Sequence, residues 1–145
     1  MTDEPSMSQP AFELHPQLAA DTFVVGELPL SRLLLMNDHR FPWCILVPRR
    51  QELRDLHELD ATESADLFAE IRRVSLRLLA LGHVDKLNVA ALGNRVPQLH
   101  VHVVARRTND AAWPGPVWGS GPAQPYAPAE VKTLLTNLRT ALHLG

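Results

Sequence analysis

The chain has 145 residues, of which 46% are hydrophobic and 21% are charged, and its formal net charge is −2. A chain of this length buries about 68% of its unfolded surface in one ordinary domain. Its composition is close to the globular average, which excludes disorder, a coiled coil or a collagen-like structure for the chain as a whole. Because the charges nearly balance, we expect no nucleic-acid partner and no binding to an anionic membrane.

Cysteine usage and the first residues bear on cellular location. Cys44 is the single cysteine, so an intramolecular disulfide and a cysteine-rich zinc module are excluded, which favours a reducing compartment. Residues 1–10 are polar and mildly acidic, without the basic and apolar regions of a signal peptide. No apolar run approaches the roughly 20 residues of a membrane-spanning helix. We therefore expect a soluble, cytoplasmic protein with a flexible tail over residues 1–10.

Three short segments early in the chain have the composition of strands. Residues 21–28 are β-branched and aromatic and end at Pro29. The apolar runs 31–36 and 43–47 follow, each bounded by turn-forming residues. Short apolar runs with such boundaries are typical of buried strands.

A change of period marks the next element. Residues 62–81 carry apolar side chains spaced four and three residues apart, which predicts an amphipathic helix. Asp60 and Glu63 have the spacing of a capping box at its start, and Gly82 suits its end.

The remainder of the chain contains two more strand-like segments and a second helix. Residues 87–92 and 99–105 return to strand composition, and prolines and glycines interrupt residues 113–126. Pro128 then begins a second amphipathic helix. Strands, a long helix, strands and a helix in this order predict an α+β fold rather than alternating βαβ units. A glycine-rich phosphate loop is absent from the strand–helix junctions, which excludes nucleotide binding by that route.

The segment 98–106, Gln-Leu-His-Val-His-Val-Val-Ala-Arg, contains the residues suited to chemistry. Alternate side chains of a strand share one face. Gln98, His100 and His102 are therefore predicted to project together, with Arg106 further along. The intervening side chains are apolar and are predicted to face the core.

Three interpretations of the two histidines are open from their spacing. They can be ordinary core or surface histidines, because an i, i+2 pair also arises by chance. They can be two ligands of a zinc or iron ion, with a third ligand from His39 or an acidic residue, although none stands at an informative spacing. They can also supply an imidazole nucleophile for attack at phosphorus.

Residues 98–106 resemble the histidine triad (HIT) motif, in which three histidines alternate with apolar residues and two apolar residues follow. The likeness extends to the opening residues 12–22 and to residues 34–48, which are similar to the family's nucleoside-binding hairpin. Residues 86–89 resemble the strand before the motif. About residues 12–107 are covered in all.

This resemblance implies a five-stranded antiparallel sheet with one long packed helix, forming a HIT-like domain over residues 11–107. Residues 108–145 are then a tryptophan- and proline-rich loop and a C-terminal helix packed on the same domain. It also implies a homodimer formed through the helix and a sheet edge. The implied activity is hydrolysis or transfer of nucleotidyl groups at an α-phosphorus, with no metal or other cofactor. Dinucleoside polyphosphates and nucleoside phosphoramidates are the substrates that we expect.

The chain departs from the family pattern at two places. Gln98 occupies the position of the first triad histidine, and Gly93-Asn94 stands where the family has Gly-Gln. Glutamine keeps a donor and an acceptor but cannot be protonated or act as a nucleophile. A nucleotide-binding module with little or no turnover is therefore an alternative to an enzyme, and a His-x-His metalloenzyme is a further one.

The resemblance assigns the catalytic roles. His100 corresponds to the nucleophile, which attacks as neutral imidazole and forms a nucleotidyl-histidine that water resolves. Its other nitrogen is expected to donate to a backbone carbonyl. His102 then bonds a non-bridging oxygen of the α-phosphate, and Gln98 bonds the bridging or leaving oxygen as a neutral donor.

Four other residues are candidate nucleotide ligands. Asn37 matches a ribose-binding position, Asn88 and Asn94 match phosphate-side positions, and Arg106 can pair with phosphate. Each has a plainer interpretation: Asn37 and Asn94 as turn residues, Asn88 as a strand-end amide and Arg106 as a solvated strand end. The segment 112–119 is either a loop that its tryptophans pin to the core or a strap near the site.

Overall fold

The computed structural model describes residues 11–144. The tail expected over residues 1–10 lies outside the described residues, so its flexibility stays a prediction. Within residues 11–144, no helix combines the length and the apolar character that crossing a membrane requires.

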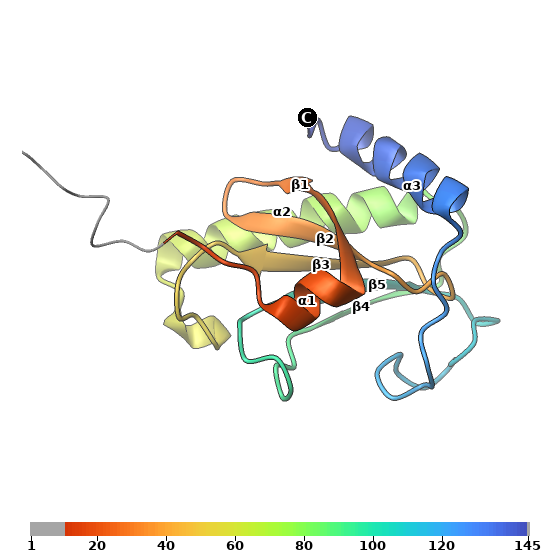
Figure 1. The fold of residues 1–145 in the computed structure, drawn as a ribbon, viewed down its shortest axis with the longest axis horizontal. Coiled ribbons are helices and arrows are strands. Elements are labelled where there is room, and N and C mark those ends of the chain that lie inside the picture. The colour runs from red at the N-terminus through yellow and green to blue at the C-terminus, as the bar shows by residue number, and fades with distance from the viewer. Residues whose placement is uncertain (1–10, 145) are drawn as a thin grey trace, which may run out of the picture.

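A five-stranded antiparallel sheet forms the centre of the molecule (Figure 1). Its spatial order is β1-β2-β3-β5-β4, so the last strand of the chain lies inside the sheet and β4 lies at an edge. The α+β fold and the five-stranded antiparallel sheet expected from the sequence are confirmed. The strands are β1 (Thr22–Glu27), β2 (Ser31–Met36), β3 (Trp43–Pro48), β4 (Lys86–Ala90) and β5 (Val101–Arg106).

Two long helices were predicted, and both form. Helix α2 (Ala61–Leu79) packs on β3 and β5, and helix α3 (Pro128–Ala141) packs on β1. The predicted capping box is present, because the Asp60 carboxylate accepts from Glu63 N at 2.8 Å and the Glu63 carboxylate accepts from Asp60 N at 3.0 Å. Two short elements were not predicted: helix α1 (Pro16–Asp21) and the 3-10 turn η2 (Leu56–Glu58).

The two faces of the sheet bury different kinds of side chain. Alternate residues of each strand point to opposite faces. The face under α2 is almost entirely aliphatic and includes Leu33, Leu46 and Val103, each 0% exposed. The other face, beside α1, collects aromatic and branched side chains: Leu18, Leu34, Phe41, Trp43, Ile45, Val47, Val104 and Val117.

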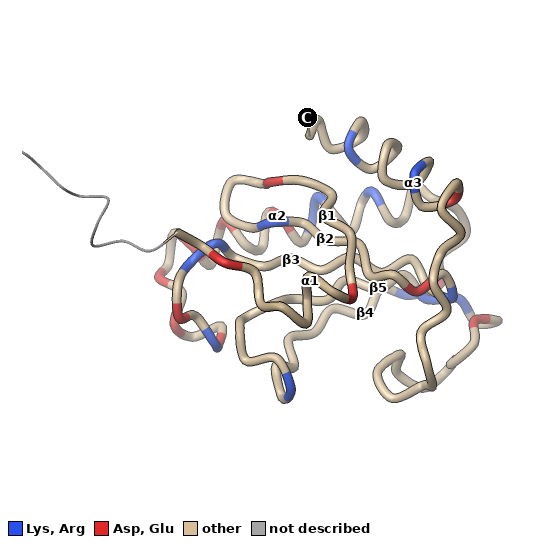
Figure 2. The backbone as a smooth tube through the Cα atoms, viewed as in Figure 1, with Lys and Arg blue, Asp and Glu red and all other residues tan. Residues whose placement is uncertain are grey.

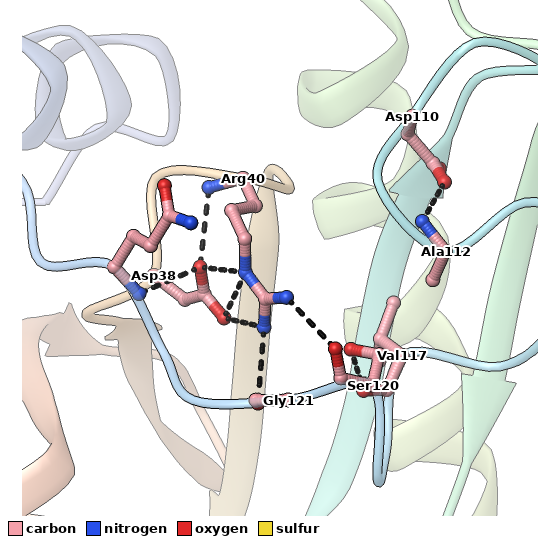
Figure 3. A network of polar contacts seen from close by, with 8 residues as sticks. Asp38, Arg40, Asp110, Ala112, Val117, Ser120 and Gly121 are labelled. Atoms are coloured by element: carbon pink, nitrogen blue, oxygen red, sulfur yellow. Dashed lines mark hydrogen bonds and ion pairs between the residues drawn. The ribbon is translucent and has the colours of Figure 1, made fainter.

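Residues 107–127, which we call the strap, connect β5 to α3 along this second face. Residues 111–127 contain no charged side chain (Figure 2). The strap is held by the turn between β2 and β3, where Arg40 donates to both Asp38 and the Ser120 carbonyl (Figure 3). Burial opposes ionisation of Asp38, but its hydrogen bonds with Arg40 outweigh burial and lower its pKa. Asp38 is therefore a charged anchor for the strap.

Candidate active site

The two motif histidines lie together at the start of β5. His102 lies in the strand, on the face away from α2, and His100 comes directly before the strand begins at Val101. The strand is thus shorter at its start than the predicted 99–105. Even so, the ring centroids lie 4.9 Å apart, and the two residues are only 6% and 5% exposed. The prediction that they project together is confirmed.

The backbone fixes the tautomer of His100. Its Nδ1 lies 2.7 Å from the Gln98 carbonyl oxygen. A carbonyl oxygen only accepts, so Nδ1 carries a hydrogen, and in the neutral imidazole the lone pair is therefore on Nε2. His100 also lines a cavity of about 250 Å³, together with residues 54–57 and 91–93 and with Leu99. The neutral ring therefore has the tautomer that a nucleophilic Nε2 requires, and it lies beside a cavity that can admit a ligand.

A tryptophan fixes the tautomer of His102. Trp43 Nε1 donates to His102 Nδ1 at 3.0 Å, and both side chains are buried. Because an indole N–H only donates, His102 Nδ1 carries the lone pair and Nε2 carries the hydrogen. Burial, followed by the charge of His100, lowers the pKa of His102 from 6.5 to about 3. His102 is therefore a neutral hydrogen-bond donor, in the tautomer opposite to that of His100.

The strap reaches this site. The Trp118 ring lies edge-on to His102, with centroids 5.2 Å apart, and 6.1 Å from the Trp43 ring. Trp118 also packs against the aromatic cluster of the second face. Both interpretations of segment 112–119 thus apply: its tryptophan pins the strap to the core and encloses His102.

The Gln98 carboxamide holds the chain segment before α1. Its Oε1 accepts from His15 N, and its Nε2 donates to the Glu13 carbonyl, each at 2.9 Å. Nε2 has a second hydrogen with no partner among residues 11–144. The sequence pattern predicted that Gln98 projects on the same side as the two histidines, but not that it would bind a segment about 85 residues away in the chain.

Arg106 is buried and bonded rather than free. It is only 2% exposed, and its guanidinium donates to both oxygens of Asp110, at 2.7 and 3.0 Å, and to Asn88 Oδ1 at 2.9 Å. The rings of Phe41 and Trp113 lie 5.5 and 5.7 Å from it. The expectations of a solvated strand end and of a cation free for phosphate are therefore wrong. Arg106 anchors the start of the strap, and Asn88 supports it.

The two turn asparagines differ in their surroundings. Asn37 is half-buried between β2 and β3, and its Oδ1 accepts from Tyr126 N at 2.9 Å, so it also holds the strap. Its amide hydrogens have no partner among the described residues. Asn94 is exposed in the loop between β4 and β5.

The His-x-His pair lacks a third metal ligand in the part of the chain that the structure describes. No group of three His, Cys, Asp or Glu side chains there is arranged to hold a metal ion. His39, the third ligand considered from the sequence, instead lies with its ring 6.4 Å from that of Tyr126.

The sheet is antiparallel and five-stranded, and it brings two imidazoles together at the start of its inner strand β5. This combination defines a protein of the histidine triad class. The HIT domain family matches residues 17–109, and the chain belongs to this family. Proteins of the family generally bind nucleotides, and many hydrolyse or transfer nucleotidyl groups. The match ends before most of the strap, so Trp113 and Trp118 lie outside it.

Solved histidine triad proteins from bacteria share the whole fold. One from Bradyrhizobium japonicum is 48% identical, with a TM-score of 0.88 over 92% of this chain and 99% of its own. One from Marinobacter aquaeolei is 45% identical, with a TM-score of 0.89 over 92% and 98%. One from Sinorhizobium meliloti is 42% identical, with a TM-score of 0.87 over 90% and 96%. No curated protein matches the chain.

Proposed function

We propose that the protein is a nucleotidyl hydrolase or transferase that cleaves at an α-phosphate through a nucleotidyl-histidine intermediate on His100. The observation that carries the proposal is the 2.7 Å contact between His100 Nδ1 and the Gln98 carbonyl, which selects the neutral tautomer with its lone pair on Nε2. Dinucleoside polyphosphates and nucleoside phosphoramidates are the proposed substrates.

The proposed reaction has two displacements at phosphorus. In the first, the lone pair of His100 Nε2 forms an N–P bond, and the bond from phosphorus to the leaving oxygen or nitrogen breaks. The leaving group keeps the electron pair and takes a proton from solvent. In the second, water attacks phosphorus, the N–P bond breaks, and the water proton is released to solvent. A second acceptor in place of water makes the reaction a transfer.

Neutral donors stabilise the transition states in this proposal. His102 Nε2–H bonds a non-bridging oxygen of the α-phosphate, where negative charge grows. The remaining amide hydrogen of Gln98 bonds the leaving oxygen. Asn37 donates to the ribose hydroxyls, and Asn88 and Asn94 are the proposed phosphate-side amides. Arg106 is not included, because its guanidinium is buried against Asp110.

Chemical quenching tests the covalent step. Enzyme mixed with a dinucleoside polyphosphate carrying a radiolabelled α-phosphate is denatured in alkali, and the labelled peptide is mapped. We expect acid-labile, alkali-stable label on His100 in the wild type and none in His100→Ala. The matched control is His83→Gln, because His83 is an exposed histidine paired with Asp85, and its label is expected to equal the wild-type level. Turnover in the wild type without label on His100 would contradict the proposal.

One observation favours the binding module as a second candidate. The Gln98 carboxamide is already bonded to two backbone groups of the N-terminal segment, and it cannot deliver a proton to a leaving group. Release of mononucleotide separates the candidates. Nucleotide binding equal in wild type and His100→Ala, with release in neither, identifies the module.

The same proposal includes a homodimer and a cytoplasmic location. Helix α2 exposes Phe68 (76%), Leu76 (44%) and Leu79 (43%), and the edge strand β4 exposes Val89 (47%). These apolar side chains suit a second copy of the chain. We expect light scattering to give twice the chain mass for the wild type, and a single chain mass for Phe68→Glu.

A further inference from the structure

We infer that Trp43 is a positioning residue, which commits His102 to the tautomer that donates from Nε2 and so gives the site a donor that does not change with pH. The inference rests on the proposed function, since it assigns His102 a task at the phosphate. The Trp43 indole bonds His102 and packs against the rings of Phe41 and Trp118, and Trp43 acts through that histidine.

The sheet register places the two side chains together. Ile45 pairs with His102, and Trp43 pairs with Val104, so Trp43 is the diagonal neighbour of His102 on the same face. Diagonal neighbours lie within reach of an aromatic side chain. The indole nitrogen then meets the imidazole at 3.0 Å, with Trp43 6% exposed and His102 5% exposed.

Only one tautomer satisfies this contact. If the hydrogen were on His102 Nδ1, two N–H groups would face each other without an acceptor in a buried place, which is costly. Trp118 does not offer an alternative acceptor. Its Nε1 has no partner among the described residues, and its ring meets the imidazole edge-on. Trp118 therefore encloses His102, while Trp43 orients it.

The groups that face His102 do not favour its protonated form. From β3 they are Trp43 and Ile45, and from β4 the paired residue is Ala90. From the strap the contacting group is the Trp118 ring. Directly before β5 it is His100, whereas Arg106, four residues further along the same face, is paired with Asp110.

None of these neighbours is an unpaired carboxylate that would stabilise an imidazolium, and a charge on His100 would oppose one. The lowered pKa of His102, with burial as its first cause, agrees with this arrangement. His102 Nε2–H is thus present across the neutral range. A tautomer fixed in advance avoids reorientation during the reaction.

Nitrogen NMR of histidine-labelled protein tests the inference directly. In the wild type we expect His102 to have a protonated Nε2 and an unprotonated Nδ1, with no titration between pH 5 and 9. His100 is expected to show the opposite tautomer in its neutral form. Assignment uses His100→Ala and His102→Gln. A wild-type His102 with protonated Nδ1, or one that titrates in this range, would overturn the inference without any assay of activity.

A pair of tryptophan variants adds the functional test. Trp43→Phe removes the bonded indole N–H, and Trp118→Phe removes an indole N–H that has no acceptor in the structure. For Trp43→Phe we expect mixed tautomers or titration of His102, a kcat about tenfold lower, and a KM within twofold of the wild type. The acid limb of its kcat profile should contain an ionisation of His102 that the wild type lacks. Trp118→Phe should keep the wild-type tautomer and the wild-type pH profile.

The outcomes separate this inference from the proposed function. An unlabelled His100 together with the expected His102 spectrum contradicts the covalent mechanism and supports the orienting contact. The role of Trp43 is overturned if His100 is labelled and Trp43→Phe has the same spectrum and pH profile as Trp118→Phe. If Trp43→Phe does not fold, the wild-type spectrum alone still decides.

Discussion

The two faces of the sheet are equally buried but are built in different ways. On the face under α2, β5 contributes Val101 and Val103, which are 3% and 0% exposed. On the opposite face the same strand contributes His102 and Arg106, which are 5% and 2% exposed. Burial is the same, yet the second pair must be hydrogen-bonded, because buried polar groups without partners are costly.

The partners on the polar face also set its chemistry. His102 receives Trp43, and Arg106 receives Asp110 and Asn88. On the aliphatic face, the buried polar residues among those described are Ser31 and Glu70, and the Glu70 carboxylate accepts from Leu30 N at 2.6 Å. One face therefore supplies stability through buried apolar area, while the other holds its polar groups by specific hydrogen bonds. Substitutions on the aliphatic face should therefore be detected by unfolding measurements, and substitutions of the catalytic groups on the polar face by activity assays.

The largest expected effect is on activity, at the polar face. His100→Ala should lower nucleotidyl release by about 10³-fold or more, because a covalent route is lost. Its free energy of unfolding should change far less, since the ring lines a cavity. Release assays and urea unfolding of the same preparation measure both. A variant that keeps full turnover would show that His100 is not the nucleophile.

The strap anchor should show the largest effect on stability. Asp110→Ala leaves the Arg106 guanidinium buried without its carboxylate, which costs about 3–5 kcal/mol of unfolding free energy. Urea unfolding checks the cost, and limited proteolysis should show cleavage within residues 111–127. The control is Asp66→Ala, an exposed acidic position on α2, with an expected change within about 0.5 kcal/mol. Equal stability of both variants would mean that the ion pair does not hold the strap.

The aliphatic face should give the reverse pattern to His100. Leu46→Ala removes a side chain that is 0% exposed and should lower the unfolding free energy by about 2–4 kcal/mol. Activity per folded molecule should stay at the wild-type level. The control is Leu56→Ala, at a position 50% exposed in η2 and outside the proposed dimer surface, which should change stability by less than about 0.5 kcal/mol. A loss of activity without a loss of stability in Leu46→Ala would contradict the assignment of stability to the aliphatic face and activity to the polar face.

The smallest expected effect is a pH dependence of stability that arises at His102. The pKa of His102 is lowered to about 3 in the folded protein, against 6.5 in the unfolded chain. Below pH 6.5 the unfolded state therefore binds the proton first, so stability falls as the pH falls towards 3. From pH 7 to 5 this amounts to about 2 kcal/mol. The decline should be shallower in His102→Gln, and parallel curves for the two proteins would refute it.

Much of the fold could be predicted from local sequence patterns. The predicted strand 31–36 and the start of the strand at Trp43 agree with β2 and β3, and the predicted helix 62–81 agrees with α2 to within two residues. Alternation and helical period are local properties that tertiary contacts here reinforce. The six-residue α1 was missed because its sequence lacks an apolar period long enough to detect.

The site could be predicted from the sequence only in part. Alternation correctly brought His100 and His102 to one place, and it placed Arg106 on the same face as His102. It could not show that Asp110 would turn back to bind Arg106, or that the Gln98 amide would hold the segment before α1. These contacts depend on where loops return to the sheet, and a strand pattern contains no information about that.

Residue order and polarity were thus enough to specify a sheet with an apolar side and an imidazole-bearing side, because period-two alternation acts within a few residues. The tautomer of His102 needed the folded chain. It follows from an indole 59 residues away, brought within bonding distance by strand register and enclosure under the strap. Hydrogen-bond donors select a tautomer only at contact distance, and contact between distant segments exists only after folding.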